Sequence, residues 1–229
     1  CLSNFTFLRG ASHPAELVHQ AYALGYRALA LTDECSISGV VRAHVAAREL
    51  GLQFIIGSEF TLNNGDKFVL LVTNKNGYRQ LTRLITLARR RAPKGEYHLT
   101  VDDLRAKSLS DCLSLVVCDP SPTPIERKHA KFQAISDHAK RLKSLMPNRV
   151  WLTLEQPGYG TDECHQKNLE ALSENLQIPI VATGNVHMHC RARQPLHDTL
   201  TAIRHQKSIL NIKHCLAANA ERHLRSKKF

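Results

Sequence analysis

The sequence predicts an α/β fold in which short strands alternate with helices around a parallel sheet, and it favours a barrel over an open sheet. Short apolar runs alternate with segments of helical periodicity along the 229 residues, as in successive βαβ units. Polar residues follow several of these runs directly. Barrel folds place their sites at the carboxyl ends of parallel strands, so this pattern favours a barrel.

Each predicted element has a local reason. Ser12 can cap a first helix that has Pro14 in its opening turn. The first strand covers residues 28–32 in the stretch ALALTDECSISGV, and Asp33 and Glu34 follow it directly. By the same periodicities, further strands are expected at 53–60, 67–73, 113–118, 149–155 and 178–183, and further helices at 40–50, 77–91, 100–106, 125–145, 162–175 and 191–205.

The alternation of predicted strands and helices ends after the last predicted strand. We expect residues 1–190 to form the barrel domain and residues 191–229 to form a helical exit segment leading into a following domain. The chain starts with Cys1 rather than Met, which is typical of a fragment of a longer protein. His197 on this exit segment is expected at the surface or between domains.

Composition excludes several classes of protein. The 43% hydrophobic content is enough for a sizeable core. No apolar run approaches the roughly 18 residues that span a bilayer, and no basic-then-apolar leader is present, so we expect neither a membrane partner nor a secretory signal. The seven cysteines are scattered without zinc-site spacing, which indicates reduced thiols and a cytoplasmic location.

The chain is basic, with a formal charge of +11 and a pI near 9.5, which is compatible with a polyanionic partner. Much of the excess lies in residues 79–94 and 126–149. Solvated helix faces are the alternative interpretation of both stretches. Aromatic residues are few and are not interleaved with the charges, unlike the stacking platforms that bind single strands.

Metal-ligating side chains occur at several predicted strand ends. Histidine, carboxylate and cysteine groups converging on one barrel mouth are the ligands of a metal site that activates water for phosphodiester cleavage. A satisfied structural polar group is the alternative for each residue alone. The strand-end groups are Asp33, Glu34, Glu59, Cys118, Glu155, Asn185 and His187.

Several stretches closely resemble the start of bacterial C-family DNA polymerase catalytic subunits of the DNA polymerase III alpha type, most of all the error-prone branch used in damage tolerance. They are CLSNFTFLRGAS, ALALTDECSISGVVRAHVAAREL, IIGSEF, NKNGYRQLTRLI, IVATGNVHMHCRARQPLHDTLTAIR and ERHLRS. The resemblance spans nearly the whole chain and is weakest between about residues 92 and 148. It implies an N-terminal polymerase-and-histidinol-phosphatase (PHP) domain, with a distorted TIM-like (β/α)7 barrel of the PHP type.

The resemblance also implies a metal site, which this sequence has largely lost. Active PHP domains hold metal ions and hydrolyse phosphoesters, and some replicative polymerases use the domain as a 3′–5′ exonuclease. Here the family's carboxylate and thiol positions are retained as Glu59 and Cys118, and the last histidine as His187. The aspartate after the strand is retained as Asp33. The family's other ligand positions fall on Leu2, Arg9, Glu34, Lys67 and Asn185.

The chemistry of these replacements argues against a tight metal cluster. Arg9 and Lys67 place cations where a divalent metal would bind, and we interpret them as metal-replacing residues. A guanidinium also pairs with carboxylates bidentately, so Arg9 is expected to bridge Glu34 or Glu59. We therefore expect no tightly bound cofactor in this domain, with weak Zn or Mn binding as the alternative.

Three functions stay open on the sequence alone. The first is a non-catalytic scaffold that packs against the palm and thumb of the same polymerase chain. The second is a metal-dependent phosphoesterase or exonuclease with residual activity. The third is a nucleic-acid-binding module, suggested by charge. Nucleotide incorporation would belong to Mg²⁺-binding carboxylates of the downstream palm, which would also bring the parent protein to DNA. Whether this stretch is itself an enzyme is left open.

Overall fold

The computed structural model describes residues 1–106, 108–120 and 125–226. By its internal contacts the chain forms two compact units. Unit 1 combines Cys1–Ile56 with Gly184–Phe229, and unit 2 is the continuous segment Gly57–Thr183. The division at residue 190 expected from the sequence does not coincide with these units and stays a prediction. All seven cysteines are free thiols, and in the described residues no helix is long and apolar enough to cross a membrane.

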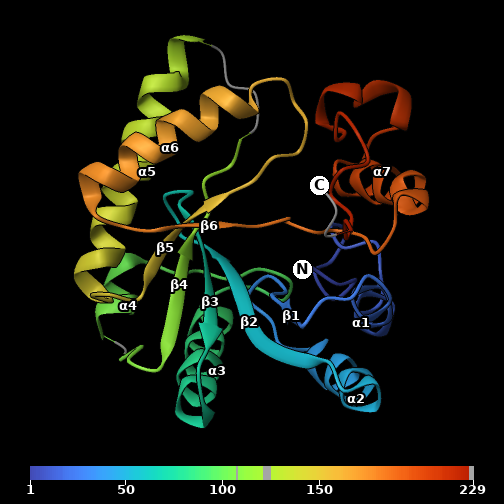
Figure 1. The fold of residues 1–229 in the computed structure, drawn as a ribbon, viewed down its shortest axis with the longest axis horizontal. Coiled ribbons are helices and arrows are strands. Elements are labelled where there is room, and N and C mark those ends of the chain that lie inside the picture. Colours follow the sequence, from blue (N-terminus) through green and yellow to red (C-terminus); the bar gives the residue numbers. More distant parts are fainter. Residues whose placement is uncertain (107, 121–124, 227–229) are drawn as a thin grey trace. The chain divides into compact units, whose positions relative to one another are not determined.

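Unit 1 is built from both ends of the chain. Strand β1 pairs in parallel with the first part of β2, from Ala28 opposite Gln53 to Leu31 opposite Ile56. Helices α1 and α2 pack on each other (Figure 1), and their apolar faces make a core with β1 that includes Leu17 and Ala43. The elements of unit 1 are α1 (Pro14–Ala23), β1 (Ala28–Leu31), α2 (Val40–Leu50), the start of β2 (Gln53–Thr61), the 3-10 helix η1 (Arg191–Arg193), α7 (Gln194–Arg204), and the 3-10 helices η2 (Ile209–Asn211) and η3 (Lys213–Cys215).

Unit 2 carries the rest of the sheet. The second part of β2 pairs antiparallel with β3, β3 pairs antiparallel with β4, and the pairs β4–β5 and β5–β6 are parallel. The elements after β2 are β3 (Lys67–Val72), α3 (Lys75–Arg90), α4 (Val101–Ala106), β4 (Cys112–Val116), α5 (Ile125–Leu145), β5 (Val150–Leu154), α6 (Asp162–Leu176) and β6 (Ile180–Ala182).

The α/β fold is confirmed, but the expected all-parallel sheet is wrong. Residues 62–66 form a tight turn in place of a helical crossover, with the Leu62 N–H donating to the Asp66 carbonyl at 2.8 Å and Gly65 at φ +89°. A short turn of this kind can join only antiparallel strands. The order β1-β2-β3-β4-β5-β6 gives six strands in the described residues, where the resemblance implied seven.

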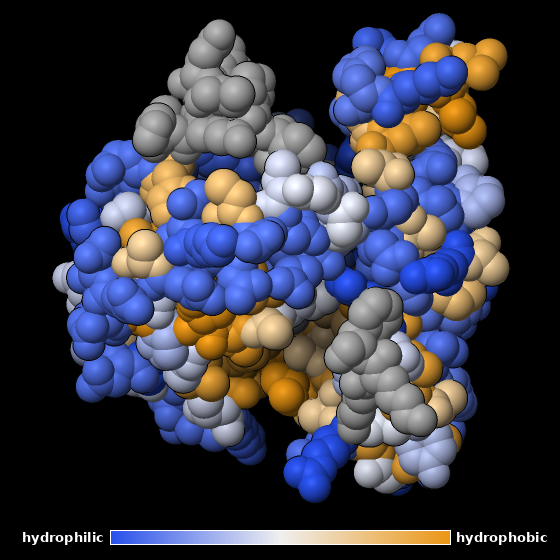
Figure 2. Space-filling view, turned by 45° about the horizontal axis from the view of Figure 1, so that its top comes forward, coloured by the Kyte–Doolittle hydropathy of each residue, from blue (hydrophilic) through white to orange (hydrophobic). Residues whose placement is uncertain are grey.

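One face of the unit 2 sheet is covered by helices. Alternate residues of β3 point toward this face, and Phe68 and Leu70 on it have no exposed surface. The Phe68 ring lies 5.4 Å from the Phe60 ring and 6.0 Å from the His138 ring of α5. Helix α3 packs against β3 and β4, α5 against β4 and β5, and α6 against β5 and β6 (Figure 1). Figure 2 shows that the outer surface over α5 and α6 is mainly hydrophilic.

Predicted element ends shift by a few residues, for physical reasons. Helix α1 begins at Pro14 after His13, not after Ser12, because the Ser12 hydroxyl lies 2.8 Å from the His189 ring. The His13 N–H instead donates to Glu16 at 2.8 Å. At the start of α4 the Thr100 hydroxyl accepts from the Asp103 N–H at 3.4 Å and the Thr100 N–H donates to the Asp103 carboxylate at 2.9 Å, which makes a capping box.

Candidate functional site

Asp33 lies two residues after the end of β1 and is the most enclosed carboxylate of unit 1, with 1% of its surface exposed. Its Oδ1 accepts hydrogen bonds from the Ser3 N–H and the Thr6 hydroxyl, each at 2.7 Å, and its Oδ2 accepts from the Ser3 hydroxyl at 2.7 Å. Gly39 makes room for this arrangement, because a Cβ there would lie 2.8 Å from Oδ2. The lone pairs that a metal would need are therefore directed at donors of the N-terminal loop.

Glu34, the next residue, is held by a cation of the protein itself. The Arg9 guanidinium lies 2.5 Å from the Glu34 carboxylate, and their side chains are 15% and 25% exposed. The Glu34 N–H donates to the Thr6 hydroxyl at 3.0 Å, which ties this pair to the Asp33 network. Arg9 was expected to bridge Glu34 or Glu59, and it forms an ion pair with Glu34. The guanidinium brings a fixed positive charge to this carboxylate.

His187 closes a short chain of hydrogen bonds in the same unit. Its Nε2 lies 3.1 Å from the Asn185 Oδ1, and its Nδ1 lies 3.1 Å from the His197 Nε2. Because the amide oxygen only accepts, His187 donates from Nε2 and its Nδ1 accepts from His197. Burial, together with the charges of Arg222 and Arg9, lowers the pKa of His187 well below its usual value, so the ring is neutral. His197 was expected at the surface or between domains; the surface position is wrong, since its side chain is buried within the chain.

The backbone around these side chains is locally strained. Leu8, Cys35 and Asn185 have positive φ angles of 59°, 43° and 40°. Each is adjacent to Arg9 or Glu34 or belongs to the His187 chain, and such conformations cluster where a site constrains the backbone. Leu2 is 2% exposed and brings no ligand atom.

The remaining predicted residues lie in unit 2. Glu59 pairs with Val69 and Thr61 with Lys67, so Glu59 and Lys67 lie on the same face of the β2–β3 hairpin. Glu59 is 4% exposed. Cys118 follows β4 and is fully buried, and its thiol donates to the Val116 carbonyl at 3.5 Å. Burial raises the pKa of this thiol to about 12, which keeps it protonated and makes it a poor ligand in this state.

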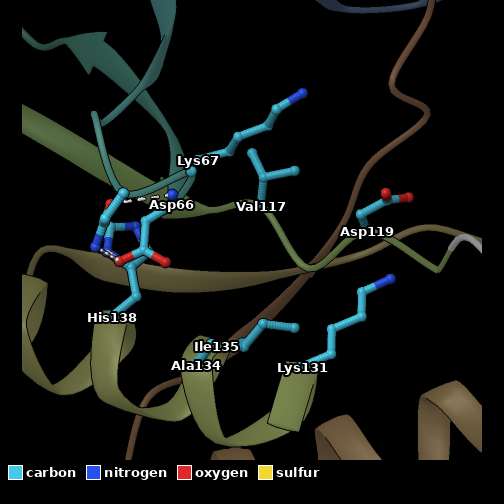
Figure 3. A pocket seen from close by; sticks show the side chains of 10 residues that line it. Asp66, Lys67, Val117, Asp119, Lys131, Ala134, Ile135 and His138 are labelled. Carbon is cyan, nitrogen blue, oxygen red and sulfur yellow. Dashed lines mark hydrogen bonds and ion pairs between the residues drawn. The ribbon is translucent and has the colours of Figure 1, made fainter. Parts of the chain in front are cut away.

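Unit 2 also contains a pocket of about 300 Å³ beside the start of β3, the segment after β4 and α5 (Figure 3). Val117 and Ile135 line its middle, and His138 lies at one end beside Asp66, with 3.4 Å between the His138 Nδ1 and an Asp66 carboxylate oxygen. Asp66 is paired with Arg141 at 2.6 Å. Carboxylates and cations both line this pocket, so its charge selects no class of ligand.

These positions do not fit a resident metal ion. In residues 1–106, 108–120 and 125–226, no group of three or more His, Cys, Asp and Glu side chains lies close enough together to hold one. In unit 1, Asp33 is satisfied by hydroxyl and N–H donors and Glu34 by a guanidinium. The pKa of His187 also responds to Arg222, Arg9 and the terminal amine, so a divalent ion would enter a positive environment.

Comparison with solved structures defines the class of fold. A protein from Bifidobacterium adolescentis assigned as a metal-dependent phosphoesterase superposes with a TM-score of 0.55 at 13% identity, covering 82% of this chain and 86% of that one. An amidohydrolase from Chromobacterium violaceum, solved with sulfate and without metal, gives 0.56 at 13% identity over the same shares. The chain therefore has the α/β fold of the PHP phosphoesterases.

The family follows from sequence. The model of the PHP domain matches residues 1–157, and the chain belongs to the PHP domain family. Relatives named error-prone DNA polymerase are 47% identical over 228 residues in Methylococcus capsulatus and 48% identical over 231 residues in Dechloromonas aromatica. The alignments cover 100% and 99% of this chain but 21% of each relative. The chain thus spans about a fifth of the length of these polymerases.

Proposed function

We propose that this chain is the N-terminal PHP domain of an error-prone DNA polymerase and acts there as a non-catalytic scaffold. The observation that carries the proposal is that the ligand positions of unit 1 are satisfied within the protein, with Arg9 on Glu34 and hydroxyl donors on Asp33. The parent protein would synthesise DNA on a template in the cytoplasm during damage tolerance and repair. Its Mg²⁺ would be held by the palm, outside this chain.

The scaffold role is supported by apolar surface on the last elements of unit 1. Leu196 and Ile203 on α7 are 39% and 55% exposed, and Ile209 and Leu210 in η2 are 43% and 78% exposed. Exposed apolar groups in sequence proximity are typical of interaction surfaces. The relatives are about five times longer than this chain, so the expected occupant is the rest of the same polymerase chain, including palm and thumb.

The alternative is a metal-dependent phosphoesterase or 3′–5′ exonuclease with weakly bound Zn or Mn. It is favoured by the retention of Glu59, Cys118 and His187 at family ligand positions. Two observations argue against this alternative: the Cys118 thiol is protonated, and the surroundings of His187 are positively charged.

Metal analysis and a nuclease assay separate the two functions. We expect purified protein to hold well under one Zn, Mn or Fe per chain, and to leave a 3′-labelled single strand intact with Mn²⁺ or Zn²⁺ added. Cleavage that depends on metal and is lost in His187→Ala, but kept in the exposed control His205→Ala, would establish the hydrolase and overturn the scaffold proposal.

The scaffold contact itself is tested by polar substitutions on α7 and η2. The double variant Ile203→Ser with Leu210→Ser should unfold at the same temperature as the parent sequence in the 229-residue chain, since both side chains are exposed. In the full-length polymerase it should lower both the unfolding temperature and DNA synthesis. Val41→Ser, at a site on α2 that is 71% exposed, is the matched control. If the double variant and Val41→Ser had the same unfolding temperature and the same DNA synthesis in the full-length protein, the surface of α7 and η2 would not be the scaffold contact.

A further inference from the structure

Helix α3 carries a row of cations on its outer face and contains no acidic residue. Spacings of four and seven residues place side chains on the same face of a helix. All members of the row are exposed to solvent. The row, called here the α3 cation stripe, consists of Lys75, Arg79, Arg83 and Arg90.

The opposite face of α3 fixes the stripe in place. Leu81, Leu84 and Ala88 are fully buried as the helix packs on β3 and β4. Gly77 lets the helix approach the neighbouring backbone, because a Cβ there would lie 2.1 Å from the Asp111 carbonyl oxygen. The Asn74 side chain caps the first turn by accepting from two backbone N–H groups. The stripe is thus held on a rigid element.

The stripe cations differ from the adjacent arginines in the contacts that they make. Arg91 pairs with Asp103 at 2.6 Å, and Arg89 donates to two loop carbonyls and lies over the Tyr97 ring at 5.2 Å. Among the described residues, no carboxylate forms an ion pair with Arg79, Arg83 or Arg90. Arg89 and Arg91 therefore stabilise the fold through these contacts. The stripe cations face solvent, and no carboxylate in the described part of the chain neutralises their charge.

We propose that the α3 cation stripe binds the phosphate backbone of duplex DNA, independently of base sequence. Its length from Lys75 to Arg90 is about 22 Å at 1.5 Å per residue, which matches about six phosphates along one strand at 3.4 Å each. Arginine binds phosphate bidentately and is weakly hydrated, so three arginines suit this contact better than lysines.

Duplex DNA is favoured over single strands by what the stripe lacks. Proteins that hold single strands combine cations with aromatic side chains on which bases stack. In α3 the only aromatic residue is Tyr78, which is 36% exposed. The hydroxyls of Thr82 and Thr86 are bonded to carbonyls of their own helix, so they offer little to bases. A row of charges without a stacking surface matches a regular backbone.

Salt-dependent binding of the 229-residue chain tests the proposal. A fluorescent duplex of about 20 base pairs is titrated by anisotropy between about 50 and 200 mM NaCl. Four phosphate contacts predict a slope of log K against log salt of about −3.6, or about a hundredfold loss of affinity over this range. The variant Arg79→Gln, Arg83→Gln, Arg90→Gln should lower the steepness of the slope by about 2.7 and weaken binding at every salt concentration.

A variant with the same change of net charge provides the control. Arg48→Gln, Lys207→Gln, Lys213→Gln removes three exposed cations elsewhere and should leave the slope unchanged. Both triple variants should keep the parent unfolding temperature, because the altered side chains are exposed. An equal loss in both variants would overturn the assignment to α3. Tighter binding of a single strand of equal length, or displacement of the duplex by polyglutamate of equal charge, would also overturn it.

Discussion

Two carboxylates of this protein, Asp33 and Asp66, lie in different surroundings, the first buried and the second half-buried. Asp33 in unit 1 receives three hydrogen bonds of 2.7 Å from Ser3 and Thr6 and is 1% exposed. Asp66 in unit 2 lines an open pocket, where the neighbouring His138 has both ring nitrogens buried without a hydrogen-bond partner in the described part of the chain. Both carboxylates are paired, Asp33 with donors of the N-terminal loop and Asp66 with Arg141 and Asn64, but the His138 ring beside Asp66 makes no hydrogen bond within the described residues.

The difference shows how a buried carboxylate is stabilised within the protein. A buried carboxylate needs hydrogen-bond donors, because an unpaired buried charge costs several kcal/mol. Asp33 has found them in the loop that precedes it. The polar groups around Asp66 are only partly satisfied, so they should contribute less to folding. Substitutions in the two regions test this contrast.

The largest effect is expected for Asp33→Ala. The change leaves three donors buried without an acceptor, and hydrogen bonds to charged groups contribute about 1.5–3 kcal/mol each. We expect the free energy of unfolding to fall by about 3–5 kcal/mol in urea titrations. Asp102→Ala, at a carboxylate that is 84% exposed, should change it by less than about 0.5 kcal/mol. Equal stability of Asp33→Ala and the parent would show that the network is not structural.

The second largest loss of unfolding free energy is expected for Gly39→Ala. Its new methyl group would lie 2.8 Å from Asp33 Oδ2 and 3.0 Å from the Ser3 hydroxyl, so the network must shift at a cost of about 1–3 kcal/mol. The cost should shrink in the Asp33→Ala background, because the crowded oxygen is then absent. Urea unfolding of the two single variants and the double variant measures this coupling. Additive effects would contradict it, and Ser38→Ala nearby is the neutral control.

The third prediction concerns the pocket and its dependence on pH. Burial lowers the pKa of His138, so the unfolded chain, with a histidine pKa near 6.5, binds protons more readily than the folded one. This contribution to stability is complete above about pH 6.5 and is lost as pH falls, by up to about 1.4 kcal/mol per pH unit. His138→Leu should flatten the fall of unfolding free energy between about pH 7.5 and 5.5. His98→Leu, at an exposed histidine, should leave it unchanged.

The smallest effect is expected for Arg9→Gln. The Arg9–Glu34 pair is partly exposed, and pairs of this kind contribute about 1 kcal/mol or less. The loss should diminish at high salt, unlike that of Asp33→Ala, because exposed charges are screened. Urea titrations at low and high NaCl distinguish the two. A loss as large as that of Asp33→Ala would mean that Glu34 is a full member of the buried network.

The sequence predicted most elements because their signals are local. Helix α2 begins at Val40 and ends before Gly51 as expected, and α5 covers its expected range. Strand β3 was predicted, but its antiparallel direction was missed because the loop 62–66 was not interpreted as a hairpin turn, although the Asn-Gly-Asp sequence is typical of one. Local periodicity identifies strands but does not fix their direction.

The candidate site was only half predictable. Family positions identified Asp33, Arg9 and His187, and the chemistry of a guanidinium indicated a carboxylate partner. Ser3 and Thr6 gave no signal, because hydroxyl groups in a loop are common and their role depends on where the loop folds back. His197 was missed since its burial depends on how α7 packs, which periodicity alone does not give.

The two-ended construction of unit 1 has a consequence for how the chain acquires its structure during synthesis. The Leu2 N–H donates to the Val186 carbonyl, and the Tyr26 hydroxyl donates to the Arg225 carbonyl. Residues 1–56 therefore cannot complete unit 1 until the ribosome has added the roughly 130 residues up to position 184. This takes on the order of ten seconds at about 5–20 residues per second. Unit 2 is continuous and can fold in that interval. The Asp33 network should then be among the last parts of this domain to be completed.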